Sequence, residues 1–231
     1  MGILAVVLGG CAVGRVAGAP GVEVARAALA GGNPVLALQA GQRVLARDPS
    51  DGAALVVTGE ALAALGQVGH AVDRLRAGVA RVPSDWGARV VLGRLLARIS
   101  PGVAAVQFRA VVAARPGDWV AWNDLGVVRD LRGRHRAARV AYRTALAARP
   151  GFRAAQVNLA LSLAMSGRAA EAAEMMRTLG PGSSGRVRAD WAAVTAMAGH
   201  PRAAAGMLGA AMPADQVAAA IQAYTALGSG G

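Results

Sequence analysis

The chain has 231 residues, of which 55% are hydrophobic, so it can bury a sizeable core and is not an intrinsically disordered protein. Only 3% of the residues are aromatic and much of the apolar content is alanine, which favours closely packed helices. The formal net charge is +12, but every basic residue is an arginine, a bias typical of high-GC codon usage. The charge therefore does not by itself indicate a nucleic-acid ligand.

Residues 1–20 contain an apolar stretch that ends in small residues at Cys11, the single cysteine of the sequence. Leu8-Gly9-Gly10-Cys11 resembles the lipobox of bacterial lipoproteins, and the resemblance implies cleavage before Cys11 and diacylation of its sulfur. Two features depart from that pattern: no basic residue precedes Cys11, and the apolar region is short. The alternative is an ordinary apolar N-terminus with a chance cysteine. No later run of eighteen apolar residues is free of charge and proline, so no membrane span is expected.

Prolines recur along the chain at spacings of 34, 33 and 34 residues, and these are Pro49, Pro83, Pro116 and Pro150. Each follows a stretch rich in alanine and arginine, where it ends a helix because it cannot donate the backbone hydrogen bond. Glycines mark a second turn within the units, and these are Gly32, Gly66, Gly133, Gly167 and Gly199. Near residue 100 the turn is Ser100-Pro101-Gly102 instead. The period predicts repeats of two helices each.

One unit carries a specific motif, composed of Trp122, Leu125, Gly126, Ala138, Tyr142, Ala145 and Pro150. At all seven positions this unit resembles the tetratricopeptide (TPR) repeat, although Arg129 stands where the pattern usually has tyrosine. The resemblance implies an all-α fold, an α-solenoid of stacked antiparallel helix pairs (a TPR superhelix). Stacked pairs share a core that one pair cannot bury, and small residues such as Gly126 and Ala138 allow the helices to approach closely.

The repeat predicts five segments. A signal-like or lipobox-like N-terminus and linker occupies residues 1–20, and a degenerate opening helix pair occupies 21–50, with helices at Val22–Ala30 and Pro34–Ala46. Four TPR units follow at 51–184, a worn fifth unit at 185–212, and a capping helix with a flexible tail at 213–231. We expect the capping helix at Asp215–Leu227. Weak end repeats are expected because a terminal unit covers its neighbour on one side only.

TPR geometry places the first helix of each unit on a concave face that can receive a peptide or a partner helix. The expected partner groove consists of Glu60, Arg94, Asn123, Val127, Asp130, Asn158 and Leu161. Asn123 and Asn158 are candidates for hydrogen bonds to the backbone of an extended peptide. Only Arg94 among these residues is basic, which disfavours a clamp for a C-terminal carboxylate.

Four arginines, Arg132, Arg136, Arg139 and Arg143, follow a spacing of three to four residues. We expect them on one face of the second helix of their unit. One interpretation is a solvated convex face. The alternative is a basic face that docks to an acidic partner or to lipid headgroups near a membrane.

We expect no enzyme activity, no cofactor and no metal site. His70, His135 and His200 are spaced 65 residues apart, so they are predicted to be exposed turn residues along one edge rather than metal ligands. The sequence has no lysine, which excludes a P-loop or a Schiff-base lysine. Ser183 and Ser184 have no partner histidine or aspartate at a recognisable spacing.

The predicted function is a non-catalytic scaffold for protein–protein interaction. A basic TPR protein with a lipobox resembles the TadD-type lipoproteins of Flp/Tad (tight-adherence) pilus assembly. That resemblance implies pilus or secretion components as partners and a lipid-anchored location on the periplasmic side of the outer membrane. The alternative is a cytoplasmic TPR adaptor in a regulatory or enzyme complex, and acylation of Cys11 discriminates the two. The scarcity of aromatic residues for base stacking disfavours nucleic acid as a partner.

Overall fold

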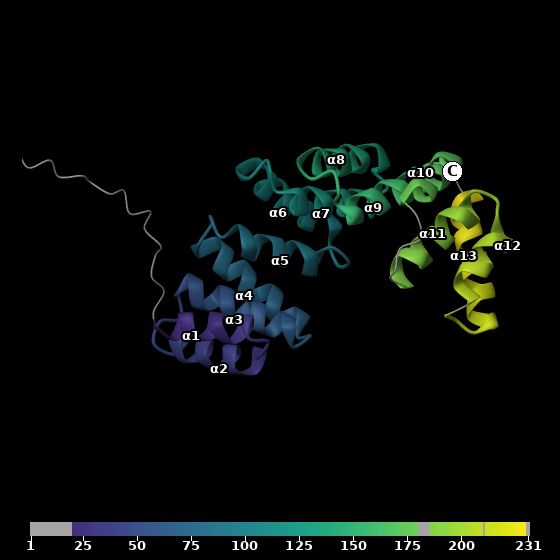
Figure 1. Cartoon of the computed structure of the whole chain (residues 1–231). Coiled ribbons are helices and arrows are strands. Elements are labelled where there is room, and N and C mark those ends of the chain that lie inside the picture. The colour runs from purple at the N-terminus through teal and green to yellow at the C-terminus, as the bar shows by residue number, and fades with distance from the viewer. Residues whose placement is uncertain (1–19, 180–184, 210, 230–231) are drawn as a thin grey trace, which may run out of the picture. The chain divides into compact units, whose positions relative to one another are not determined.

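The computed structural model describes residues 20–179, 185–209 and 211–229, and the regular structure in these ranges is helical (Figure 1). The helices are α1 (Pro20–Ala30), α2 (Pro34–Leu45), α3 (Gly52–Ala64), α4 (Val68–Arg81), α5 (Trp86–Leu96), α6 (Pro101–Ala114), α7 (Trp119–Asp130), α8 (His135–Ala148), α9 (Arg153–Ala164), α10 (Ala169–Leu179), α11 (Gly185–Met197), α12 (Pro201–Gly209) and α13 (Ala214–Ser229). None of these helices has both the length and the apolarity needed to cross a membrane. Cys11, the predicted lipidation site, lies outside the described residues.

The chain divides into two compact units, residues 1–84 with α1–α4 and residues 85–231 with α5–α13. Within each unit, consecutive helices pack against each other, and alternate helices such as α1 and α3 or α7 and α9 are also in contact. Within a unit, each helix pair is therefore covered by the next pair, because a single pair cannot bury its own apolar stripe. The predicted all-α solenoid of stacked helix pairs is confirmed.

The turns lie where the period of proline and glycine predicts them. Pro49 lies between α2 and α3, and Pro116 lies between α6 and α7. The five glycines that close the first helices have φ values between 67° and 86°, and they are Gly32, Gly66, Gly133, Gly167 and Gly199. A side chain with a Cβ is strained in this left-handed region, which explains glycine at these positions. Between α5 and α6 the turn differs, because Pro101 begins α6 directly after Ser100.

Three first helices begin at an aspartate that caps them. The side chains of Asp51, Asp85 and Asp118 each accept a hydrogen bond, 2.9–3.0 Å long, from the backbone N–H three residues further on. Such caps satisfy a free helix donor and place negative charge at the positive end of the helix dipole. These caps were not predicted, although each aspartate lies two residues after one of the periodic prolines.

The helices of a pair approach closely where a glycine on the first helix meets a large side chain on the second. A Cβ built on Gly126 would lie 2.3 Å from Cε1 of Tyr142, and one built on Gly93 would lie 2.7 Å from Cζ of Phe108. Both rings are almost completely buried. The expected role of Gly126 in close helix approach is thus confirmed, and Ala138 beside it is fully buried.

Several predicted positions differ from the structure. The opening helices, expected at Val22–Ala30 and Pro34–Ala46, span Pro20–Ala30 and Pro34–Leu45. The capping helix continues past Leu227 to Ser229, because the following Gly228 and Ser229 retain helical geometry. Arg132, expected on the second helix of its unit, instead lies in the turn before α8, which begins at His135. The left-handed Gly133 separates Arg132 from that helix.

Candidate functional site

The candidate site is a hollow of about 840 Å³ in the unit formed by residues 85–231. Its walls come from the first helices of successive pairs: α5, α7, α9 and α11. The lining residues are Arg94, Asn123, Asp124, Val127, Arg153, Ala154, Val157, Asn158, Leu161, Val187 and Asp190. First helices contribute because they stack side by side, as the contacts of α7 with α9 and of α9 with α11 show.

A chain of hydrogen bonds crosses this hollow from helix to helix. Asn158 Nδ2 on α9 donates to Asn123 Oδ1 on α7 at 2.9 Å, and Asn123 Nδ2 donates to Asp124 Oδ1 at 3.4 Å. From α5, Arg94 Nε donates to Asp124 Oδ2 at 2.7 Å. Four side chains from three helices are therefore held in fixed relative positions, a condition for recognising a ligand without a large loss of side-chain entropy.

Asp124 is the most buried charge of this chain of hydrogen bonds, with 16% of its side chain exposed. Burial raises the pKa of its carboxyl above the usual value, and the charge and hydrogen bond of Arg94 oppose that rise. Arg94 itself is about half exposed and uses its Nε for the ion pair. Its two terminal nitrogens have no other hydrogen bond among the described residues, so they can donate to a ligand.

The remaining lining is suited to an extended polypeptide. Val127, Val157 and Leu161 supply an apolar floor. Asn158 keeps its side-chain oxygen as an acceptor, since only its Nδ2 is used in the bond to Asn123. A hollow with an apolar floor and a few fixed donors and acceptors can bind the side chains and the backbone of one segment at the same time.

Five of the seven predicted groove residues come together in this hollow, namely Arg94, Asn123, Val127, Asn158 and Leu161. Glu60 lies on α3 in the other compact unit. Six lining residues were not among the seven predicted: Asp124, Arg153, Ala154, Val157, Val187 and Asp190. Asp124 is adjacent to Asn123 and three residues before Val127 on one helix, so helical spacing could have identified it. The sequence did not indicate that α11 lines the hollow, because the repeat that contains α11 is degenerate.

Asp130, the seventh predicted groove residue, does not line the hollow. Its carboxylate accepts a hydrogen bond from Tyr142 Oη at 2.9 Å and another from Ser162 Oγ at 2.8 Å. His135 Nδ1 lies 2.8 Å from the same carboxylate. Asp130 therefore joins α7, α8 and α9 inside the stack. All of these contacts are internal, and its residue type alone could not have revealed them.

The predicted basic face is not one surface. Arg136 and Arg143 are exposed on α8 and Arg132 is exposed in the preceding turn, but Arg139 is buried, with 7% exposure. Arg139 Nη1 donates to Ser166 Oγ at 2.7 Å and to the carbonyl of Ser162 at 3.4 Å. Its position on α8 faces α9 instead of the solvent. Burial lowers the pKa of Arg139, and the neighbouring arginines lower it further.

The histidines are only partly as predicted. His70 and His200 are exposed, whereas His135 has 22% of its side chain exposed and contacts Asp130. The expectation of three exposed turn histidines is therefore wrong for His135, because Asp130 lies on the adjacent end of α7. Within the described residues, no group of three His, Cys, Asp or Glu side chains could hold a metal ion.

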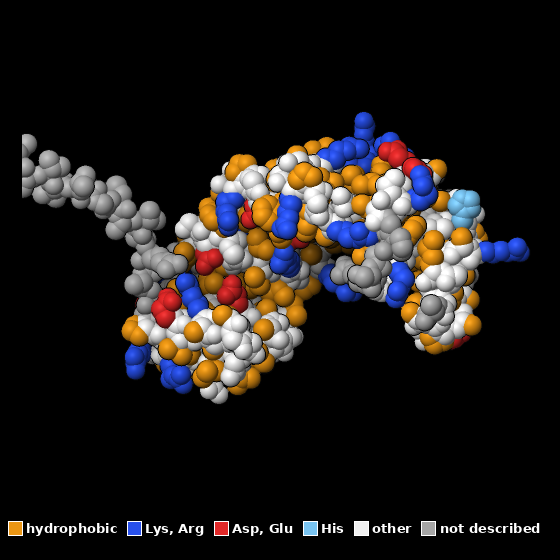
Figure 2. All heavy atoms as spheres, viewed as in Figure 1, with side chains coloured by type: hydrophobic (Ala, Val, Ile, Leu, Met, Phe, Trp, Pro, Cys, Tyr) orange, Lys and Arg blue, Asp and Glu red, His pale blue; other side chains and the backbone are white. Residues whose placement is uncertain are grey.

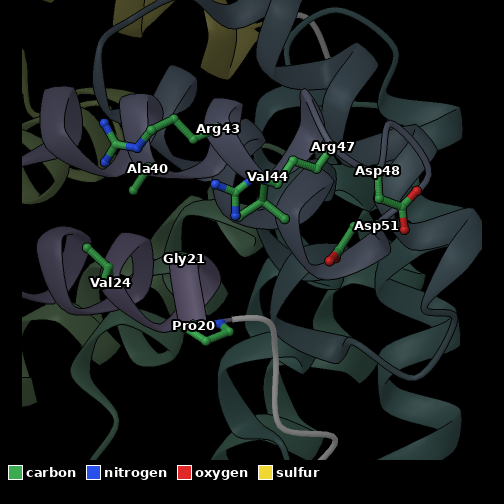
Figure 3. A pocket seen from close by; sticks show the side chains of 9 residues that line it. All are labelled: Pro20, Gly21, Val24, Ala40, Arg43, Val44, Arg47, Asp48 and Asp51. Atoms are coloured by element: carbon green, nitrogen blue, oxygen red, sulfur yellow. The ribbon is translucent and has the colours of Figure 1, made fainter.

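A second hollow of about 510 Å³ lies between α1 and α2 (Figure 3). Val24 on α1 and Val44 on α2 line it, together with Arg43 and Arg47. Its two acidic residues form hydrogen bonds within their own turn, since Asp48 accepts from Ser50 and Asp51 caps α3. Among the residues that the structure describes, no hydrogen bond links its polar side chains from one helix to another, so the hollow across α5, α7, α9 and α11 is the better-organised site.

Comparison with known proteins agrees with this architecture. Residues 23–73 and 132–184 match the tetratricopeptide repeat family. A structure of MamA from Desulfovibrio magneticus RS-1 is similar at 23% identity and a TM-score of 0.64, over 70% of this chain and 94% of that chain. YrrB, a TPR protein with an unusual peptide-binding site, is similar at 19% identity and a TM-score of 0.63, over 68% of this chain and 82% of that chain. No curated protein sequence matches the chain. At these identities the likeness establishes a TPR-type fold.

Proposed function

We propose that this chain is a scaffold that binds other proteins, and that the hollow across α5, α7, α9 and α11 receives an extended segment of a partner. The observation that carries the proposal is the hydrogen-bonded chain Asn158–Asn123–Asp124–Arg94, which spans three first helices. TPR-type solenoids generally serve as non-catalytic scaffolds, and YrrB is an example whose binding site takes a peptide.

The pattern of donors and acceptors defines the kind of segment that would fit. The free terminal nitrogens of Arg94 suit a carbonyl or a carboxylate, whereas the Asn158 oxygen suits a backbone N–H. Asp124 partly neutralises Arg94 at 2.7 Å, so the site does not require a strongly acidic ligand. A segment with alternating apolar side chains over Val127, Val157 and Leu161 fits best.

The test is selection of peptides from a random library on the purified chain, followed by affinity measurement with Asn158→Ala. We expect at least about a fivefold loss of affinity, because a fixed hydrogen-bond partner of the peptide backbone is removed. Gln42→Ala is the matched control, since Gln42 is an exposed amide on α2 in the other unit. Peptides that bind all three proteins equally well would contradict this site.

A finer proposal concerns the setting in which the scaffold works. We propose a lipid-anchored protein facing the periplasm, which assists assembly of a Flp/Tad-type pilus or secretion machine. Its support is the sequence Leu8-Gly9-Gly10-Cys11 together with the TPR-type fold. Intact mass and membrane fractionation of the wild type and Cys11→Ser in a Gram-negative host test it. A cysteine-dependent mass increase with recovery in the outer membrane is expected.

The second candidate is a cytoplasmic TPR adaptor in a regulatory or enzyme complex. An unmodified Cys11 and recovery in the cytoplasmic fraction would favour it over the lipoprotein. Both candidates use the same hollow, so the peptide experiment and the acylation experiment are independent of each other.

A further inference from the structure

A mixed surface of arginine and aliphatic side chains covers the outer faces of α6 and α8 and the turn between α7 and α8. On α6 the exposed residues Val103, Val106 and Arg109 are spaced by three, and along α8 the exposed positions recur every three to four residues, so each helix turns one stripe outward. Figure 2 shows blue arginine and orange hydrophobic side chains together along the edge over these helices. We name this the outer surface; its members are Val103, Val106, Arg109, Leu131, Arg132, Arg134, Arg136, Val140 and Arg143.

The positive charge of the outer surface is not compensated by the protein. Residues 131–170 contain eight arginines and no aspartate or glutamate. The five arginine side chains of the outer surface have no ion pair or side-chain hydrogen bond among the described residues. The two carboxylates of α7 are used elsewhere: Asp124 pairs with Arg94, and Asp130 is bonded to Tyr142.

Four of these arginines lie close enough to affect two less exposed arginines nearby, Arg129 and Arg139. Arg109 and Arg134 both lower the pKa of Arg129, after the larger effect of burial. Arg143 and Arg136 act in the same direction on Arg139, again after burial. Repulsion between like charges opposes folding, so a ligand that supplies negative charge would stabilise the arrangement.

Aliphatic side chains lie among the charges. Val140 is 57% exposed on α8 between Arg136 and Arg143, and Leu131 is 54% exposed next to Arg132. On α6, Val103 and Val106 precede Arg109 on the same stripe and are also exposed. The outer surface therefore offers apolar contact between its cations, as interfacial membrane-binding surfaces do.

We propose that the outer surface docks the chain onto an anionic phospholipid membrane, with the arginines at the headgroup phosphates and the aliphatic side chains at the interface. This site is separate from the peptide hollow and does not depend on its function. It also does not require acylation of Cys11, although an anchor would add to the affinity.

Three features favour a lipid surface over the other anionic partners. A protein interface normally combines both signs of charge to set its register, whereas this surface carries one sign over α8 and the preceding turn. Duplex nucleic acid would satisfy the arginines but would offer nothing to Val106 or Val140. A bilayer surface is laterally uniform and anionic, and it has apolar groups within reach just below the phosphates.

The test is co-sedimentation of the full chain carrying Cys11→Ser with vesicles of equal parts phosphatidylglycerol and phosphatidylcholine, and with phosphatidylcholine vesicles alone. We expect binding to the anionic vesicles that weakens with salt and little binding to the neutral ones. The triple variant Arg109→Gln, Arg136→Gln, Arg143→Gln should lose about a hundredfold in affinity, roughly fivefold for each arginine.

The matched control is the triple variant Arg74→Gln, Arg76→Gln, Arg81→Gln. It removes the same charge from three exposed arginines of α4. We expect this control to lose far less affinity for the anionic vesicles than the triple variant of the outer surface. Equal losses in the two triples would mean attraction by net charge alone and would overturn the proposal. Circular dichroism should show unchanged helicity in both, since all six side chains are exposed.

The aliphatic side chains give a second, independent readout. Val106→Ser with Val140→Ser keeps the charge and should weaken binding to anionic vesicles by at least about threefold, because apolar contact is lost. Its binding to duplex DNA should stay unchanged. If the wild type binds duplex DNA or a polyglutamate peptide more tightly than the vesicles at the same salt concentration, the lipid assignment is wrong.

Discussion

Tyr142 on α8 donates a hydrogen bond from its hydroxyl to Asp130 Oδ2 on α7, at 2.9 Å. The same carboxylate accepts from Ser162 on α9 at 2.8 Å, so one aspartate connects two helices of a pair with the first helix of the next. Tyr142 is almost fully buried, and burial together with the negative charge of Asp130 raises its pKa. The hydroxyl therefore stays protonated and keeps its role as donor.

The first prediction concerns this hydroxyl. Tyr142→Phe should lower the free energy of unfolding by about 1–3 kcal/mol, because a buried carboxylate loses a donor. The ring itself should still fit, since Phe108 occupies the equivalent place against Gly93. Urea unfolding followed by tryptophan fluorescence measures the change. Tyr224→Phe is the control, because the hydroxyl of Tyr224 has no hydrogen bond among the described residues, and this variant should unfold like the wild type.

Gly126→Ala tests the close approach of α7 to α8. The added methyl would lie 2.3 Å from Tyr142 Cε1, so the ring or the helix must shift. We expect the free energy of unfolding to fall by about 1–3 kcal/mol. Gly206→Ala on α12 provides the contrast, since a Cβ there has no neighbour within 4 Å. Its free energy of unfolding should rise by up to about 1 kcal/mol, because alanine has a higher helix propensity than glycine. Chemical denaturation measures the free energy of unfolding of both variants. Changes of the same sign and size in the two variants would refute the packing argument.

Arg139 and Arg143 differ in burial although both were expected on one exposed face. Arg139→Ala should lower the unfolding free energy by about 2 kcal/mol, because Ser166 and the Ser162 carbonyl lose a charged donor and a cavity is left. Arg143→Ala should stay within about 0.5 kcal/mol of the wild type, since its side chain is exposed. Equal unfolding midpoints for these two variants would contradict the inward position of Arg139.

The fourth prediction is a pH dependence at Asp124. Because burial raises its pKa in the folded state, the unfolded chain releases this proton first as the pH rises. The contribution of Asp124 to the stability of the fold is therefore most favourable when the pH is below 3.8, the ordinary pKa of an aspartate. It decreases as the pH rises from there through the pKa of Asp124 in the folded state. The melting temperature of Asp124→Asn relative to the wild type should increase between pH 3 and pH 7. A difference that does not vary with pH, or that falls, would show that the ion pair with Arg94 outweighs burial.

Much of the architecture could be predicted because it follows from local rules that repeat. Pro116 stops one helix because it has no backbone N–H to donate. Gly133 closes another because its left-handed backbone conformation would strain a residue with a Cβ. The repeat then assigned Arg94, Asn123 and Asn158 to first helices, and these three do line one hollow. For these residues, the period was enough to predict the turn or the helix on which each one lies.

Residues that depend on contacts between pairs could not be assigned in the same way. Asp130 has the spacing of a groove residue, but Tyr142 and Ser162 bind it inside the stack. Arg139 has the spacing of an exposed face, but α9 covers it. Helical periodicity gives the direction of a side chain from its own helix and contains no information on which neighbour lies there.

The sequence by itself determined the number and order of the helix pairs in the repeats, because turn chemistry and the proline period act within a few residues. Only the tertiary structure decided which polar side chains are shared between helices and which remain free for a ligand. Asn123 and Asp124 are adjacent in the chain, yet they bond to Asn158 and Arg94, which lie 35 and 30 residues away. Hydrogen bonds of this kind depend on how the first helices of successive pairs stack against each other, as α7 and α9 do, and local sequence rules contain no information on that stacking.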